Sequence, residues 1–217
     1  MKLHREQVIS LKLANAFCFH DQIQLFSLKF DSTLTAFAYL RSLSVYNIKL
    51  ADLQSICCSF SNLKCLIDLK IQFHDEKEAT YVYCAVVLSN APTSLRKCVL
   101  SNRGCLGVSL EKLETSNNIE ELWMNDCTIA DVLRLLKYST NLNKLTIGFR
   151  PDDVITPSTN TYIPSPKLTY LKMNIRRDIH FGQVESLLKL CGINLKEFYF
   201  HADDLLRNDF TYTDVVA

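Results

Sequence analysis

The chain has 217 residues, of which 48% are hydrophobic and 22% are charged, proportions that exclude a disordered or collagen-like protein. Its 24 basic and 23 acidic residues give a net charge of +1, so no overall field favours nucleic acid or an anionic membrane. Only 5 glycines and 5 prolines are present, too few for a sheet sandwich with many tight turns. We therefore expect neither a nucleic-acid partner nor a membrane partner.

Eight short segments along the chain share the pattern apolar-x-x-apolar-x-apolar. In chain order they span 8–13, 40–45, 66–71, 95–100, 119–124, 142–147, 168–173 and 195–200. Their starts are separated by 32, 26, 29, 24, 23, 26 and 27 residues. A short apolar pattern at so regular a period predicts one strand per repeating unit.

The two faces of these expected strands differ in polarity. Because side chains alternate along a strand, the third, fifth and seventh residues of each segment should point away from the core. Only Ala14, Val99 and Trp123 are unambiguously apolar among these 24 outward positions, whereas all 24 core-side positions are apolar. A register slip of one residue would bury charged side chains such as Lys70 and Glu121, which favours the register chosen.

Segments with helical spacing of apolar residues lie between the expected strands. The predicted helices span 50–60, 79–88, 108–113, 129–138 and 182–191, with Asp131 near the start of the fourth. The alternation of strand and helix predicts an α/β solenoid or horseshoe, with about eight parallel strands on its concave face and helices or loops on its convex face. We predict a single domain over 1–217, with a proline-rich loop at 150–167 in place of a helix and a C-terminal cap at 202–217.

Several details resemble one known family. The dipeptide Asn-Leu precedes a strand at Asn62, Asn141 and Asn194, and the run 119–127, Ile-Glu-Glu-Leu-Trp-Met-Asn-Asp-Cys, ends in Cys127. These residues resemble the irregular, cysteine-containing leucine-rich repeats of F-box proteins, whose period of about 20–29 residues covers all spacings but the first. The resemblance implies a protein-binding module that recognises the substrate of a ubiquitin ligase. A stand-alone leucine-rich-repeat scaffold or inhibitor is the alternative.

The sequence departs from that family in two respects. The ninth repeat position, where the family carries Asn or Cys to satisfy backbone groups of the loop, is kept only at Cys127. Residues 1–7 leave no room for an F-box before the first repeat. We expect a ubiquitin-ligase adaptor as a partner only if an F-box precedes this chain.

No catalytic template matches the sequence. His-Glu-x-x-His, Gly-x-Ser-x-Gly, Cys-x-x-Cys and glycine-rich phosphate loops are all absent, and the five histidines lack metal-ligand spacing. We expect no enzyme activity, no cofactor and no metal. The densest thiol group, Cys57, Cys58 and Cys65, is expected to be packed in the core, because free cysteine behaves as a small hydrophobic residue. A thiol enzyme is the distant alternative.

The nine cysteines are an odd number, no Asn-x-Ser/Thr site occurs, and residues 1–7 lack the apolar core of a signal peptide. The longest apolar run, 81–88, is far shorter than the roughly 20 residues that cross a bilayer. These features favour a reducing compartment, so we expect the cytoplasm or the nucleus.

The outward face of the strands is the predicted protein-binding surface. Trp123, the single tryptophan, is the expected anchor, because buried aromatic side chains dominate protein interfaces. Packing over neighbouring lysine stems would be its alternative role. The candidate binding residues are Tyr46, Lys70, Lys97, Glu121, Trp123, Lys144, Tyr170, Lys172 and Tyr199.

Overall fold

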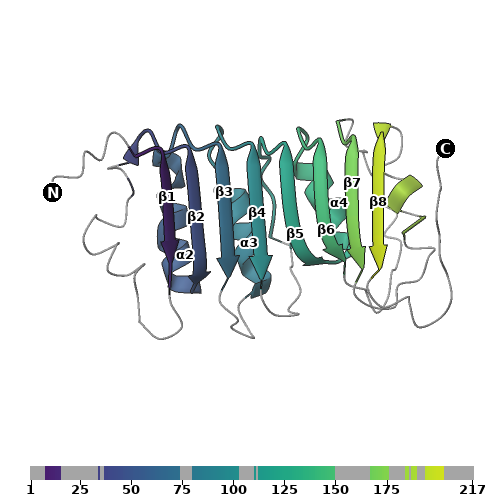
Figure 1. Ribbon diagram of the computed structural model, residues 1–217, viewed down its shortest axis with the longest axis horizontal. Coiled ribbons are helices and arrows are strands. Elements are labelled where there is room, and N and C mark those ends of the chain that lie inside the picture. Colours follow the sequence, from purple (N-terminus) through teal and green to yellow (C-terminus); the bar gives the residue numbers. More distant parts are fainter. Residues whose placement is uncertain are drawn as a thin grey trace.

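A single sheet of eight parallel strands organises the molecule, and neighbours in the sheet are also neighbours in the sequence (Figure 1). The computed structural model describes residues 8–15, 34, 37–73, 80–102, 110, 112–149, 167–175, 184–185, 187–189 and 194–202. The strands are β1 (Ser10–Ala14), β2 (Ser42–Ile48), β3 (Asp68–Phe73), β4 (Lys97–Asn102), β5 (Glu121–Cys127), β6 (Lys144–Phe149), β7 (Tyr170–Ile175) and β8 (Glu197–Ala202). The predicted α/β fold with eight parallel strands is therefore confirmed.

The sequence pattern located each strand and its register. Every strand begins two residues after the first apolar residue of its segment, as in β1 after Val8 and β8 after Leu195. The strands pair in parallel so that equivalent positions of successive segments are Cα partners, for example Leu43 with Leu69 and Leu145 with Leu171. The core-side rows are thus continuous stacks of apolar side chains.

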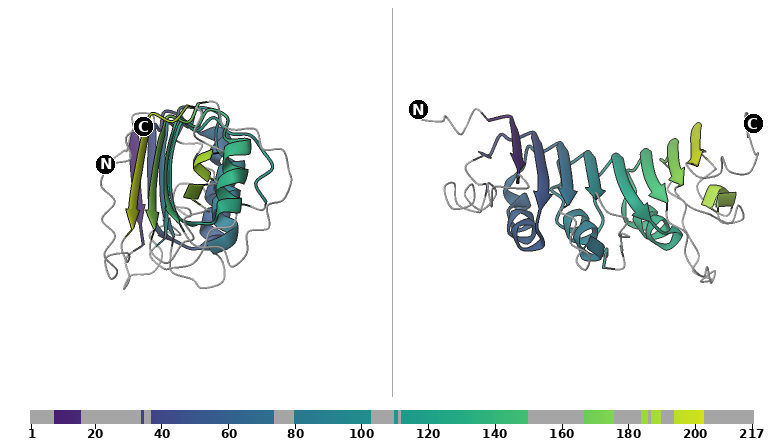
Figure 2. Two further views of the ribbon diagram at one scale, coloured as in Figure 1. Left: turned by 90° about the vertical axis from the view of Figure 1, so that its right-hand side faces the viewer. Right: turned by 60° about the horizontal axis from the view of Figure 1, so that its bottom comes forward.

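The described helices all lie on one face of the sheet (Figure 2). They are α2 (Leu50–Cys58), continued by the 3-10 helix η3 (Phe60–Asn62), α3 (Thr80–Ser89) and α4 (Ile129–Tyr138). The helices α2, α3 and α4 lie where the apolar spacing predicts them. Residues 184–185 and 187–189 are also helical, in agreement with the helix expected at 182–191.

The helix expected at 108–113 is not supported by its described residues. Leu110, Lys112 and Leu113 lie outside any helix, although both leucines are fully buried. The backbone N–H of Leu110 donates to Asp131 Oδ1 on α4 at 2.6 Å. The segment is therefore held by packing and by a side-chain acceptor rather than by a helical ladder.

The core fills the space between the sheet and the helices. The central strands contribute fully buried leucines such as Leu69, Leu145 and Leu171. At the C-terminal edge, by contrast, the core-side Phe198 and Phe200 are 38% and 41% exposed. Core-side burial is therefore incomplete in the terminal strands. Leu11 on β1 is also only half-buried, and within the described part of the chain β1 and β8 each have one neighbour in the sheet.

Two strands carry irregularities that the alternation rule does not anticipate. In β2 the register shifts between Tyr46 and Ile48, and Asn47 between them adopts a left-handed backbone with φ of 55°. The Asn47 side chain is buried and donates from Nδ2 to the carbonyl oxygen of Asn15 at 2.8 Å. In β5 the register shifts between Met124 and Cys127, so Asn125, expected to point outward, is buried instead.

The proline-rich loop expected at 150–167 and the C-terminal cap expected at 202–217 lie outside the described residues except for Lys167 and Ala202. Within the described ranges, no helix is long and apolar enough to cross a membrane.

Candidate functional site

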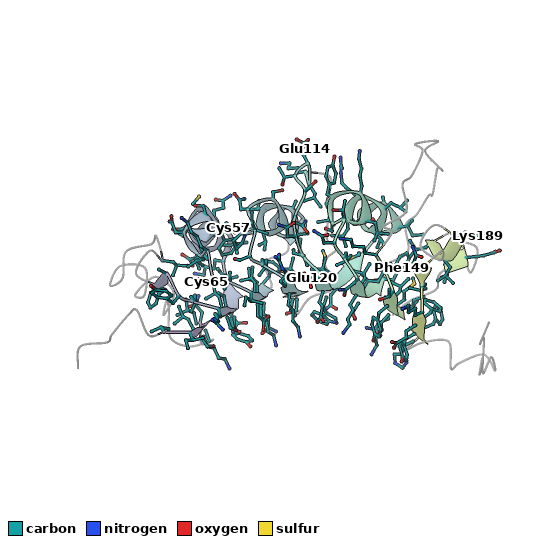
Figure 3. The ribbon with its side chains drawn as sticks, turned by 90° about the horizontal axis from the view of Figure 1, so that it is seen from above. Cys57, Cys65, Glu114, Glu120, Phe149 and Lys189 are labelled. Carbon is teal, nitrogen blue, oxygen red and sulfur yellow. The ribbon has the colours of Figure 1, made fainter. Side chains whose placement is uncertain are left out.

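The helix-free side of the sheet, hereafter the open face, presents the outward side chains of all eight strands. These side chains project away from the helices (Figure 3). Parallel pairing aligns them in rows that cross the strands. The first row consists of Ser10, Ser42, Asp68, Lys97, Glu121, Lys144, Tyr170 and Glu197, and the middle row of Lys12, Ser44, Lys70, Val99, Trp123, Thr146, Lys172 and Tyr199.

A groove of about 410 Å³ lies on the open face over β4 to β8. Trp123 on β5 is part of its wall, and its Cα partners on the adjacent strands are the uncharged Val99 and Thr146. The lining residues are Lys97, Cys98, Val99, Glu121, Leu122, Trp123, Lys144, Thr146, Tyr170 and Glu197. The groove therefore combines two half-buried aromatic side chains, Trp123 and Tyr170, with a charged rim.

The charges on this rim are organised around one carboxylate. Glu121 Oε1 lies 3.3 Å from Lys144 Nζ, and Glu121 Oε2 lies 3.7 Å from Lys97 Nζ. All three side chains are well exposed, so each ion pair contributes about 0–1 kcal/mol to stability. Two cations share one anion here, which leaves the β4–β6 part of the rim with one positive charge in excess.

A tyrosine pair borders the groove at its β7–β8 end. The rings of Tyr170 and Tyr199 are 5.4 Å apart, a separation typical of favourable aromatic pairs. The hydroxyl of Tyr199 donates to Glu197 Oε2 at 3.2 Å, and this hydrogen bond, together with the carboxylate charge, raises the pKa of Tyr199. This end of the groove is therefore aromatic and carries the negative charge of Glu197.

A second cluster lies at the other end of the open face. Lys12 Nζ is 4.9 Å and Lys70 Nζ is 5.5 Å from the centre of the Tyr46 ring, within the range of cation–π contacts. The three residues come from β1, β2 and β3. Two ammonium groups therefore gather at one aromatic ring, outside the groove.

The structure divides the nine candidate binding residues between these places. Lys97, Glu121, Trp123, Lys144 and Tyr170 line the groove together. Tyr199 contacts Tyr170, Lys172 lies on the middle row, and Tyr46 and Lys70 belong to the second cluster. All nine lie on strands, at outward positions of the open face.

Two charged residues of these clusters were not among the candidates. Glu197 lines the groove and accepts the hydrogen bond of Tyr199, and Lys12 lies over Tyr46. Both occupy outward positions of predicted strands, so the row alignment alone could have identified them.

The thiols offer no activated nucleophile among the buried cysteines described. Burial raises the pKa of Cys57 to about 12 and also raises the pKa values of Cys84 and Cys98. A protonated thiol is a poor nucleophile. Cys58 is exposed and Cys65 is half-buried, so the expectation of core packing is correct only for Cys57 in that group. No cluster of potential metal ligands occurs within the part of the chain that the structure describes.

No protein-family model and no curated protein sequence matches this chain. What the sheet defines is the class of fold, an open parallel α/β sheet built from successive strand-containing units.

Proposed function

We propose that this protein is a leucine-rich-repeat solenoid that binds another protein through its open face. The observation that carries the proposal is the half-buried Trp123 in a groove with charged residues at its rim. Aromatic anchors surrounded by polar residues are typical of the central parts of protein interfaces. The order of the strands supports the repeat assignment, as do all of their spacings but the first, which at 23–29 residues match leucine-rich repeats.

The open face also suits such a role mechanically. Its side chains project from strands that are hydrogen-bonded to their neighbours, so the backbone that positions them is rigid. A rigid platform lowers the entropy that must be lost on binding. The surface can therefore recognise a partner without folding around it.

The finer assignment rests on the family resemblance. We propose that the partner is a substrate delivered to a ubiquitin ligase, with this chain as the substrate-recognition part of an F-box-type subunit. A stand-alone scaffold or inhibitor with the same open face is the alternative. The two differ in one requirement, because only the ubiquitin role needs an adaptor-binding F-box in the same polypeptide.

Replacement of the anchor tests the binding proposal. Trp123→Ala should weaken partner binding by about 2 kcal/mol, or about 30-fold, because it removes the aromatic contact area of the groove. The partner is identified by cross-linking the tagged wild-type chain in its native cells, and affinities are then measured with the purified pair. Tyr39→Ala is the matched control, since Tyr39 is an exposed aromatic residue on a turn outside the open face.

Equal affinity of Trp123→Ala and wild type for the identified partner, with unchanged circular dichroism, would show that binding does not use the groove. For the ubiquitin role, the full-length protein from native cells is examined for a co-purifying ubiquitin-ligase adaptor. Its presence supports the F-box assignment. Its absence, together with a partner whose half-life is unchanged when the protein is deleted, favours the scaffold or inhibitor.

A further inference from the structure

The middle row of the open face carries lysines and no acidic residue. Lys70 on β3 and Lys172 on β7 each lie two strands away from Trp123 on β5, with Val99 and Thr146 between them. Lys70 has its ammonium group over the Tyr46 ring, and no ion pair between described residues involves Lys70 or Lys172. Two unneutralised cations therefore flank the aromatic anchor symmetrically.

The first row differs from the middle row in its charge. There Lys97 and Lys144 already share the carboxylate of Glu121. Asp68 and Glu197 add further negative charge to that row. A ligand with carboxylates is therefore drawn to the middle row, whereas a continuous phosphate backbone covering both rows would meet three acidic side chains.

The spacing of the middle row fits one backbone conformation. Adjacent strands are about 4.8 Å apart, so Trp123 is about 9.6 Å along the row from Lys70 and from Lys172. A polyproline II helix rises about 3.1 Å per residue with three residues per turn, which repeats the same side every 9.3 Å or so. A β-strand does not fit, because its same-side residues are about 6.8 Å apart.

We propose that the occupant of the open face is an acidic polyproline II segment of the partner, lying across the strands. Its acidic residues at positions i and i+6 pair with Lys70 and Lys172, and an apolar residue at i+3 packs on Trp123. The aromatic groove suits such a ligand, because polyproline II segments dock on aromatic-lined grooves and lose little entropy on binding. This inference rests on the proposed function, whose binding face it uses.

The probe is the synthetic peptide Gly-Glu-Pro-Pro-Leu-Pro-Pro-Glu-Gly, titrated into the full chain. Trp123 is the only tryptophan of the sequence, so its fluorescence reports binding at the site, and the anisotropy of a labelled peptide gives an independent affinity. The matched control peptide is Gly-Glu-Pro-Leu-Pro-Pro-Pro-Glu-Gly, which has the same composition with the leucine displaced by one position. A third peptide carries Lys in place of both Glu residues.

The first peptide should bind at least fivefold more tightly than the displaced one, and the lysine peptide should not bind. Lys70→Ala and Lys172→Ala should each raise the Kd about twofold to fivefold, as expected for exposed ion pairs, and the effect should decrease as salt is added. Lys64→Ala, an exposed lysine on a turn outside the open face, is the matched control and should leave the Kd unchanged.

Equal affinity of the protein for the two acidic peptides would show that the proposed i, i+3, i+6 spacing is wrong. Unchanged affinity of Lys172→Ala for the first peptide would show that Lys172 does not pair with its glutamate. If heparin binds as tightly as the first peptide and Trp123→Ala has no effect on either affinity, the open face attracts polyanions in general, and the proposed segment is wrong. Absence of binding by both methods at millimolar peptide rejects the segment proposed here. If the native partner nevertheless requires Trp123, the proposed function stands while this inference fails; if it does not, both fail.

Discussion

Leu145 and Thr146 are adjacent residues on β6 that lie on opposite sides of the sheet. Leu145 is fully buried among its Cα partners Leu122 and Leu171, whereas Thr146 lies on the open face beside Trp123. This pair is therefore a direct test of which face is the core. A shift of one residue in the register would exchange the two faces, and would move Trp123 and the groove to the helix-covered side of the sheet.

The same substitution at both positions should have opposite consequences. Leu145→Asp should lower the free energy of unfolding by about 4 kcal/mol or more, because it places an unpaired carboxylate in the core. Thr146→Asp should change it by less than about 1 kcal/mol. Urea denaturation followed by circular dichroism measures both values. Similar losses at the two positions would show that the assignment of faces is wrong.

At the residue scale, the sequence predicted well to which face of the sheet each strand residue points, but it did not predict where the backbone departs from regular strand geometry. The nine candidate binding residues all lie on the open face, because alternation within a strand is a strong constraint. Asn47 was not anticipated, since its role depends on a left-handed backbone and on the carbonyl of Asn15, 32 residues away. No periodic pattern encodes such a contact. Asn125 was misplaced for the same reason, because the bulge in β5 breaks the alternation.

At the scale of the element, α4 shows how the start of a helix is fixed. Thr128 precedes the helix, and its Oγ1 accepts a hydrogen bond from the backbone N–H of Asp131 at 3.1 Å. Asp131 Oδ2 in turn accepts from the backbone N–H of Thr128 at 3.1 Å, which completes a capping box. The other carboxylate oxygen of Asp131 accepts from Leu110 N–H. One side chain therefore both begins α4 and anchors the segment before β5.

The apolar spacing predicted the position of α4, and Asp131 was expected near its start. The hydrogen bond between Asp131 and Leu110 could not be predicted, because it joins residues 21 apart that no helical or strand periodicity relates. The spacing of the apolar residues in 108–113 resembled that of a helix, and the two leucines described there, Leu110 and Leu113, are buried in the core. The backbone N–H of Leu113 donates to the carbonyl oxygen of Leu110 at 2.8 Å, and this single turn is not continued as a helix through the described residues.

Substitutions at the cap should be graded by the number of hydrogen bonds they remove. Thr128→Ala should destabilise the protein by about 1 kcal/mol, the usual cost of losing a cap. Asp131→Ala should cost about 2–3 kcal/mol, because it leaves the buried N–H groups of Leu110 and Thr128 without this acceptor. Thr128→Ser retains the cap and is the control. If Asp131→Ala is no more harmful than Thr128→Ala in urea denaturation, the anchoring of Leu110 contributes nothing.

At the scale of the whole molecule, each strand pairs only with strands from the units before and after it. The strand order β1 to β8 follows the sequence, so among the described strands the central ones have two neighbours and the terminal ones have one. The consequence is visible in burial. Leu171 and Met173 on β7 are fully buried, while Phe198 and Phe200, their Cα partners on β8, are 38% and 41% exposed.

Such an arrangement predicts a gradient of stability along the sheet. In a stacked array the stability of each unit depends on its own folding and on the interfaces with its neighbours, so β8 should open more readily than β4 to β6. Hydrogen exchange followed by mass spectrometry should show amides of β5 and β6 exchanging last, and those of β8 at least tenfold faster. Phe200→Ser should leave exchange in β5 and β6 unchanged, whereas Leu145→Ala should accelerate it there. Uniform protection of the amides in all eight strands would instead mean that the sheet opens as one cooperative unit, without a gradient of stability from β5 and β6 to β8.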